Sequence, residues 1–90
     1  MIKTTPATLA LDAARRAIGE LRDAAGALSW SLTHLALAVE DDDRDSEARY
    51  RQHMAVALTR YEQAREQADR AVDCAWTALN QELEEAQPCT

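Results

Sequence analysis

A strict heptad repeat in the first half of the chain constrains the fold more than any other feature. From Leu11 to Val39, apolar residues recur at alternating intervals of three and four positions. This period of about 3.5 residues keeps one apolar stripe facing a partner helix, which is typical of a left-handed coiled coil. The repeat predicts a long helix that packs along its length on another helix. The stripe comprises Leu11, Ala14, Ile18, Leu21, Ala25, Leu28, Leu32, Leu35 and Val39.

The second half of the chain carries a matching pattern. Its apolar positions from Tyr50 onward recur with a mean period of about 3.6 residues, the period of an α-helix. Most of these positions hold alanine, so the expected helix has a narrow apolar stripe. The stripe comprises Tyr50, Met54, Ala57, Tyr61, Ala64, Ala68, Val72, Ala75, Leu79, Leu83 and Ala86.

An acidic run, Glu40–Glu47, separates the two patterns. Aspartate and serine favour turns, and negative charge is stabilised at a helix N-terminus. We therefore expect a first helix over residues 6–40, an acidic turn over residues 41–46 and a second helix over residues 46–86, all in one domain.

Residues that favour helix ends stand at these expected boundaries. Pro6 suits the first turn of a helix with Thr5 as its N-cap, and Pro88 marks the far end of the second helix. The candidates for the N-cap of the second helix are Asp43, Asp45 and Ser46.

A short acidic turn between two long helices predicts an all-α fold, a long antiparallel two-helix hairpin resembling a coiled coil. If the chain reverses near Asp43, facing positions have numbers that add to roughly 86, and large residues mostly oppose small ones. The expected facing pairs are Leu32 with Met54, Ala25 with Tyr61, Ile18 with Ala68, Ala14 with Val72, and Leu11 with Ala75.

A second apolar surface remains beyond the stripe that a hairpin buries. Trp30 and Leu37 fall opposite the expected stripe, and Gly19 and Gly26 form a row of small residues that allows close helix packing. We expect a partner interface there, with two hairpins forming a homodimeric four-helix bundle. The alternatives are ordinary exposed side chains and tolerated glycines. The predicted interface comprises Trp30, His34, Leu37, Trp76, Gly19 and Gly26.

The net charge of −6 argues against direct binding of nucleic acid, which needs clustered Lys and Arg. It suits a protein partner with a basic surface. The acidic run is either a solvated turn that caps a helix or an acidic patch that meets such a partner. The predicted patch comprises Glu40, Asp41, Asp42, Asp43, Asp45 and Glu47.

Catalytic and metal motifs are not evident in the sequence. His34 and His53 are the two histidines, and the Glu-x-x-His spacing of carboxylate-bridged metal bundles does not occur around them. We expect them to make ordinary polar contacts, with a zinc site or a pH-sensitive contact as alternatives. Cys74 is expected at the edge of the core and Cys89 in the tail, far from both histidines. The expectation is a non-enzyme without cofactor or metal.

Two functions fit these features. The first is a non-enzymatic adaptor or regulatory module that acts through protein–protein contacts. The second is a small phage-type inhibitor of a bacterial nucleic-acid-binding complex, whose acidic patches imitate phosphate. Nine of the ten basic residues are arginine, a usage typical of GC-rich bacterial or phage genomes. Without a signal peptide or a long apolar run, a cytoplasmic location and no membrane partner are expected.

Overall fold

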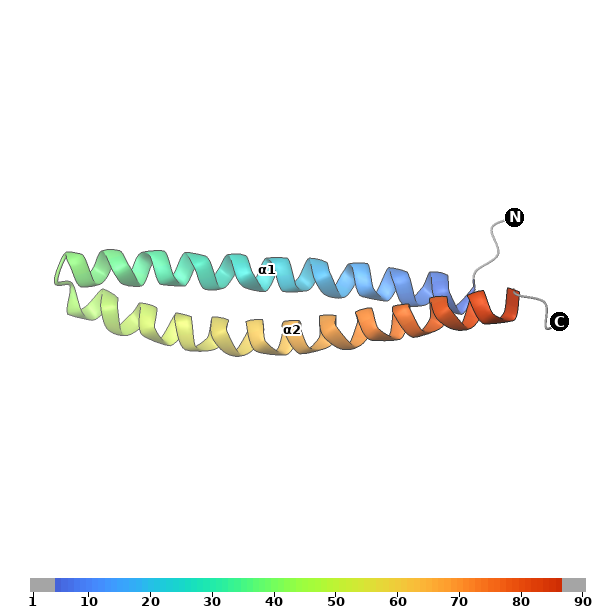
Figure 1. Cartoon of the computed structure of the whole chain (residues 1–90). Helices are drawn as coiled ribbons and strands as arrows, with labels where there is room; N and C mark the ends of the chain where they lie inside the picture. The colour runs from blue at the N-terminus through green and yellow to red at the C-terminus, as the bar shows by residue number, and fades with distance from the viewer. Residues whose placement is uncertain (1–4, 87–90) are drawn as a thin grey trace.

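In a computed structural model of the chain, two long antiparallel helices lie side by side and are joined by a tight turn (Figure 1). The structure describes residues 5–86, and side chains over residues 5–83. Helix α1 spans Pro6–Glu40 and helix α2 spans Arg44–Ala86. The predicted all-helical hairpin is confirmed. The turn is shorter than expected, because α2 begins at Arg44 rather than near residue 46; Pro88 and Cys89 lie outside the described residues.

The start of α1 follows the predicted capping pattern. Thr5 has an extended backbone, and its hydroxyl oxygen accepts a hydrogen bond of 3.2 Å from the backbone N–H of Thr8. Pro6 occupies the first helical position, where a missing N–H costs nothing. The cap therefore satisfies a backbone donor that the helix itself leaves without a partner.

The turn ends α1 through a Schellman motif. The N–H of Asp43 donates to the carbonyl of Ala38 over 3.0 Å, and the N–H of Asp42 donates to the carbonyl of Val39 over 3.2 Å. This pair of bonds requires a left-handed residue between them. Asp42 adopts that conformation, with φ of 54°. The chain thus reverses direction over three aspartates.

The last of these aspartates, Asp43, starts α2. Its carboxylate accepts a hydrogen bond of 2.7 Å from the Ser46 hydroxyl and another of 3.2 Å from the Ser46 backbone N–H. Of the three cap candidates, Asp43 has this role. The hydrogen bonds from the Ser46 side chain and backbone lower the pKa of the Asp43 carboxyl below its ordinary value of 3.8.

The helix contact of α1 follows a heptad that differs from the predicted one. Its buried and half-buried members share Ala14, Leu21, Leu28 and Leu35 with the predicted stripe. The complete row is Ala7, Ala10, Ala14, Ala17, Leu21, Ala24, Leu28, Ser31, Leu35 and Ala38. The predicted burial was wrong for four large residues, which are 42–55% exposed: Leu11, Ile18, Leu32 and Val39.

Side-chain size accounts for which of the two rows forms the contact. The predicted row and the observed row of α1 share Ala14, Leu21, Leu28 and Leu35. Their other members differ by one position. The buried version places a small residue at each differing position, such as Ala24 and Ser31 in place of Ala25 and Leu32. Among the described residues, the buried apolar side chains are all alanine. Small residues at these positions alternate with Leu21, Leu28 and Leu35, which stay half-buried in the contact row, while the larger neighbours lie outside it.

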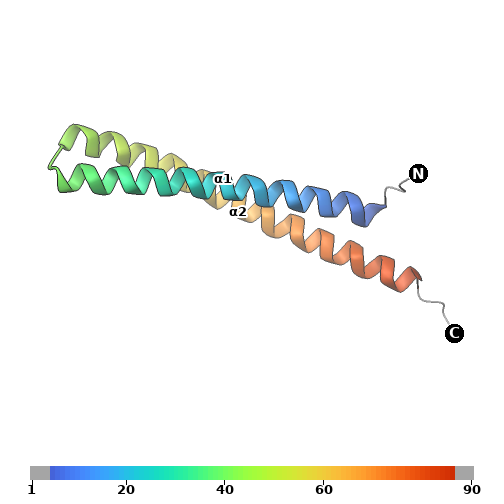
Figure 2. The ribbon, with the colours of Figure 1, turned by 90° about the horizontal axis from the view of Figure 1, so that it is seen from above.

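The contact row of helix α2 also keeps a strict heptad, as far as Glu82. The predicted stripe, with its period of about 3.6 residues, included Val72 and Leu83, but these side chains are 43% and 62% exposed. The row instead continues through Ala71, Ala78 and Glu82, which are half-buried. A row that stays on a supercoiled partner must keep a period of about 3.5 residues. Figure 2 shows the two helices crossing each other along the hairpin, as winding requires.

The register of the hairpin is close to the predicted one. At the open end, the N–H of Ala7 donates to Oε1 of Glu82 over 3.3 Å. The expected pairs Leu11 with Ala75 and Ala14 with Val72 line one groove. The molecule measures 72 × 27 × 15 Å, so it is a single layer of two helices with two broad faces uncovered.

Candidate interaction surfaces

The first uncovered surface, here called the side face, is apolar. It contains the large residues of α1 that lie outside the helix contact. It also contains the α2 residues that stand in the same position relative to the contact row of α2. Its members are Leu11, Ile18, Leu32, Val39, Leu58, Val72 and Leu79. Leu79 is half-buried and the other six are 40–55% exposed. Exposed apolar rows of this length commonly mark contacts with other molecules.

The side face is hollowed near the open end of the hairpin. A groove there is lined by seven apolar residues and one arginine. Trp76 stands at its edge with 66% of its surface exposed. Its lining is Leu11, Ala14, Arg15, Ile18, Val72, Ala75, Trp76 and Leu79. Prediction from the sequence alone misses this surface, because it places the rows through Leu11 and Val72 in the buried contact. The signal that could have revealed it is the second heptad of α1, in which alanine or serine alternates with Leu21, Leu28 and Leu35.

The side face has borders of opposite charge. On α1, Arg15 lines the groove, and Arg22 lines a neighbouring hollow with Ile18. On α2, Asp69 and Glu62 precede the edge residue Trp76 at seven-residue intervals, so they continue its row. All four charged side chains are exposed, and none forms a salt bridge with another described side chain.

The second surface, here called the aromatic face, lies near the turn on the other side of the hairpin. The Trp30 ring stacks on His34 with centroids 4.0 Å apart and lies edge-on to Tyr50 of α2 at 5.6 Å. The centroid of the Tyr50 ring lies 5.2 Å from that of His34 and 6.0 Å from that of His53. Trp30 is therefore at the edge of the helix contact and not opposite it, which corrects the predicted position. Both histidine rings thus lie beside the Tyr50 ring.

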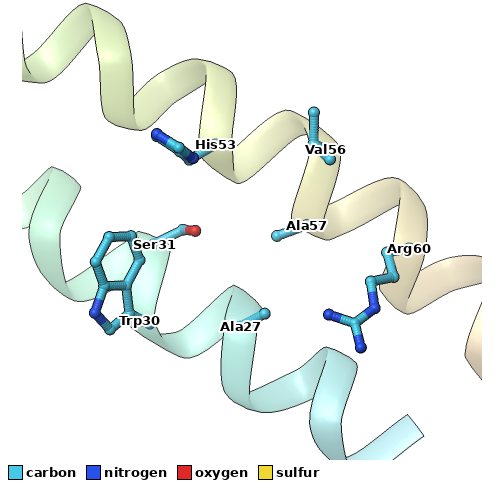
Figure 3. A pocket seen from close by; sticks show the side chains of 7 residues that line it. All are labelled: Ala27, Trp30, Ser31, His53, Val56, Ala57 and Arg60. Atoms are coloured by element: carbon cyan, nitrogen blue, oxygen red, sulfur yellow. The ribbon is translucent and has the colours of Figure 1, made fainter. Parts of the chain in front are cut away.

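A shallow hollow beside Trp30 continues the aromatic face towards the middle of the hairpin. Figure 3 shows Trp30 and His53 at one end of this hollow and the Arg60 guanidinium at the other. Ala27, Ser31, Val56 and Ala57 complete the lining. The hollow combines apolar walls with a cation, which suits a side chain that has an apolar stem and a negative end.

The remaining predicted interface residues are distributed over different surfaces. Leu37, seven positions after Trp30, is 50% exposed. A side-chain carbon built on Gly19 or Gly26 would meet nothing within 4 Å. Trp76 belongs to the side face and lies far along the rod from Trp30. The structure therefore does not bring the six predicted interface residues together into one patch.

The predicted acidic patch forms the tip of the hairpin. Five of its carboxylates are exposed, and they surround the turn. Glu47 is half-buried and accepts a salt bridge of 2.9 Å from Arg51. Asp43 is engaged by Ser46 as the cap of α2. The exposed members are Glu40, Asp41, Asp42, Asp43 and Asp45.

Four further properties bear on what the described residues can do. Over the described residues, no group of three or more His, Cys, Asp or Glu side chains is arranged to hold a metal ion. Nδ1 of His34 lies 2.9 Å from the carbonyl oxygen of Trp30, so that nitrogen is occupied within its own helix. Cys74 is exposed, whereas it was expected at the edge of the core. Neither helix, as far as the structure describes it, has a stretch long and apolar enough to cross a bilayer.

Comparisons of the chain with protein-family models, curated proteins and solved structures found no match.

Proposed function

We propose that this chain is a non-catalytic protein–protein interaction module that works as a homodimeric four-helix bundle. The observation that carries the proposal is the inverted distribution of apolar side chains. The buried apolar positions of the described hairpin hold alanine, while twelve large apolar residues are exposed. A single layer of two helices has no inner side on which to bury them.

Association would recover the hydrophobic stabilisation that the hairpin lacks. Fully burying a large apolar side chain contributes about 1.5–3 kcal/mol, so covering the exposed half of each side-face residue contributes about 1 kcal/mol. Seven such residues on each chain give a gain large enough to offset part of the entropy lost on association. Pairing two helical hairpins is the common route to a bundle of this kind.

Contacts with a different protein are assigned to the surfaces that the dimer leaves open. Trp30 and Leu37 offer an apolar anchor on the aromatic face, and Arg60 offers a nearby cation. The exposed carboxylates at the tip favour a partner with a basic surface. The module would then act as an adaptor or regulatory subunit.

A second candidate function follows from the tip. Its five exposed carboxylates form a compact negative surface on a chain of net charge −6. Such a surface can occupy a basic groove that normally holds a nucleic-acid backbone, as an inhibitor of a bacterial nucleic-acid-binding complex would. Binding through the tip would weaken steeply with salt, whereas binding through Trp30 and Leu37 would change little.

The first experiment is the mass in solution, measured by light scattering over about a hundredfold range of concentration. A mass near twice the 10.0 kDa of the chain supports the dimer. A mass near 10.0 kDa at every concentration contradicts it. For a partner captured with the purified dimer, Trp30→Glu should reduce binding if the aromatic face is the anchor. Ala13→Glu, on an exposed position of the same helix outside the side face and its borders, is the control.

A further inference from the structure

The charged borders of the side face specify what can cover it. The α1 border carries Arg15 and Arg22, and the α2 border carries Glu62 and Asp69. Between them lies the apolar row. A complementary surface needs an apolar row of the same length with acidic residues over α1 and basic residues over α2. The same face of another hairpin, turned to exchange its two borders, has this pattern.

We infer that a second copy of this chain covers the side face, related by a two-fold axis parallel to the helices. In this arrangement, α1 of each copy packs on α2 of the other, and the two turns lie at the same end of the bundle. The inference rests on the proposed homodimer and deepens it by naming the contact surface and the orientation.

The register of the hairpin shows which border residues this rotation brings together. Ile18 and Val72 line the same groove from opposite helices. Arg22 stands four positions after Ile18, and Asp69 three positions before Val72, so they occupy nearly the same level. The rotation therefore sets Arg22 of one copy against Asp69 of the other.

One heptad towards the open end, the same rotation sets Arg15 against Trp76 of the second copy. A guanidinium over an indole ring is a favourable cation–π contact. Both contacts occur twice because the axis is two-fold. The rotation therefore pairs each border of one copy with a compatible border of the other.

The other two-fold arrangement brings like charges together. An axis across the helices would stack α1 on α1 and α2 on α2, with the turns at opposite ends. Arg22, near the middle of α1, would then face its own counterpart. On α2, Glu62 would face Asp69 of the second copy. Like-charge contacts of this kind disfavour an interface, so the charged borders select the parallel axis.

Arg65 interrupts the apolar row of α2, but its charge can be compensated by neighbouring carboxylates of the same helix. It lies three positions after Glu62 and four before Asp69, which places both carboxylates on its own side of the helix. The long stem can rest on the apolar row while the guanidinium reaches the acidic border.

The arrangement also has a consequence for the proposed partner surface. With both turns at one end, the two acidic tips form a single pole that carries twice the carboxylates of one chain. The tips are exposed, so their mutual repulsion is screened by salt. A bundle with one acidic pole would engage a basic partner through that end.

The test combines an apolar substitution with a charge-reversal cycle, and reads the dimer dissociation constant by analytical ultracentrifugation. Ile18→Glu should weaken the dimer by at least about a hundredfold, because it removes a large apolar side chain and places a carboxylate in the covered row at two places in the dimer. Its matched control, Trp30→Glu on the aromatic face, should stay within about threefold of the natural chain. Circular dichroism checks that each variant remains helical. The milder Ile18→Ser serves if the glutamate variant does not.

For the orientation, Arg22→Glu and Asp69→Arg should each weaken the dimer about tenfold, and the double variant should return to within about threefold. Arg16→Glu and Asp73→Arg make the same charge changes away from the side face and should have little effect. If Arg22→Glu is neutral and Asp69→Arg tightens the dimer, the axis across the helices is correct and the inferred orientation is overturned.

The outcomes separate the inference from the proposed function. A natural chain that is monomeric throughout overturns both. A stable dimer that resists Ile18→Glu and is lost with Trp30→Glu leaves the homodimer standing and overturns the side face as its contact. Loss with Ile18→Glu together with rescue by the double reversal supports the face and the axis.

Discussion

Ser31 is 3% exposed, whereas its neighbour Leu32 is 47% exposed. A polar residue thus occupies the helix contact while the larger apolar residue beside it lies on the side face. Side-chain size decides this order, because the positions that alternate with Leu21, Leu28 and Leu35 in the contact row hold only alanine or serine. The helix contact thus buries small residues, and the leucines, valines and isoleucine of the side face stay exposed and available for association.

This relationship predicts that position 31 tolerates small residues and rejects large ones. Ser31→Leu should lower the free energy of unfolding by about 1–3 kcal/mol, since extra methylenes must force the helices apart. Ser31→Ala should change it by less than about 1 kcal/mol, because alanine fills the equivalent positions of this row. Urea unfolding at one fixed protein concentration measures both. A stabilising Ser31→Leu would show that the leucine register, through Leu32, is the true contact.

The sequence allowed prediction of the hairpin but not of the heptad row through which α1 contacts α2. Helix ends at Pro6 and Asp43 carry capping residues, and the heptad period is unambiguous, so the elements and their antiparallel packing followed. The alternating members Ala14, Leu21, Leu28 and Leu35 belong to two overlapping heptads. Choosing the bulkier one assumed that burial of large side chains decides the contact. The contact instead takes the row whose alternating members are small, and which residues fit there depends on both helices together.

The same reasoning explains what was missed about Trp30. Its predicted place opposite the contact followed from the wrong register, which displaced each assignment around α1. The cluster with Tyr50 and His53 needed the positions of both helices, and local pattern along one helix carries no such information. The N-cap of α2 was easier to narrow to three candidates, because the hydrogen bonds between Asp43 and Ser46 span only three positions.

Gly26 should be replaceable by alanine with a gain in stability. A side-chain carbon there would meet nothing within 4 Å, and the helix interior disfavours glycine by about 0.8–1.0 kcal/mol relative to alanine. Gly26→Ala should therefore raise the free energy of unfolding by about that amount. The reverse exchange at an exposed position of the same helix, Ala36→Gly, should lower it similarly. Should Gly26→Ala weaken the dimer while stabilising the helix, the glycine row would be a packing surface after all.

The turn offers a second stabilising substitution with an internal control. Asp42 has φ of 54°, a conformation that glycine adopts at no steric cost. Asp42→Gly should raise the free energy of unfolding by about 0.5–1 kcal/mol. Asp41→Gly removes the same charge one position earlier, where φ is −84° and ψ is 0°, and should bring no such gain. Equal effects of the two variants would mean that charge at the tip, and not backbone conformation, controls stability.

Asp43 should make the start of α2 sensitive to acid. The hydrogen bonds from Ser46 lower the pKa of the folded carboxyl below the ordinary 3.8, so the ionised form stabilises the folded chain. This contribution is present in full above pH 3.8 and is lost as the pH falls through the lower folded pKa. Asp43→Asn keeps a capping side chain that does not titrate. The melting temperature of the natural chain should therefore fall relative to that of Asp43→Asn as the pH is lowered from about 7 to about 2. Asp45→Asn removes a nearby exposed carboxylate and is the matched control. A constant difference between the natural chain and Asp43→Asn over this range would show that the cap does not depend on ionisation.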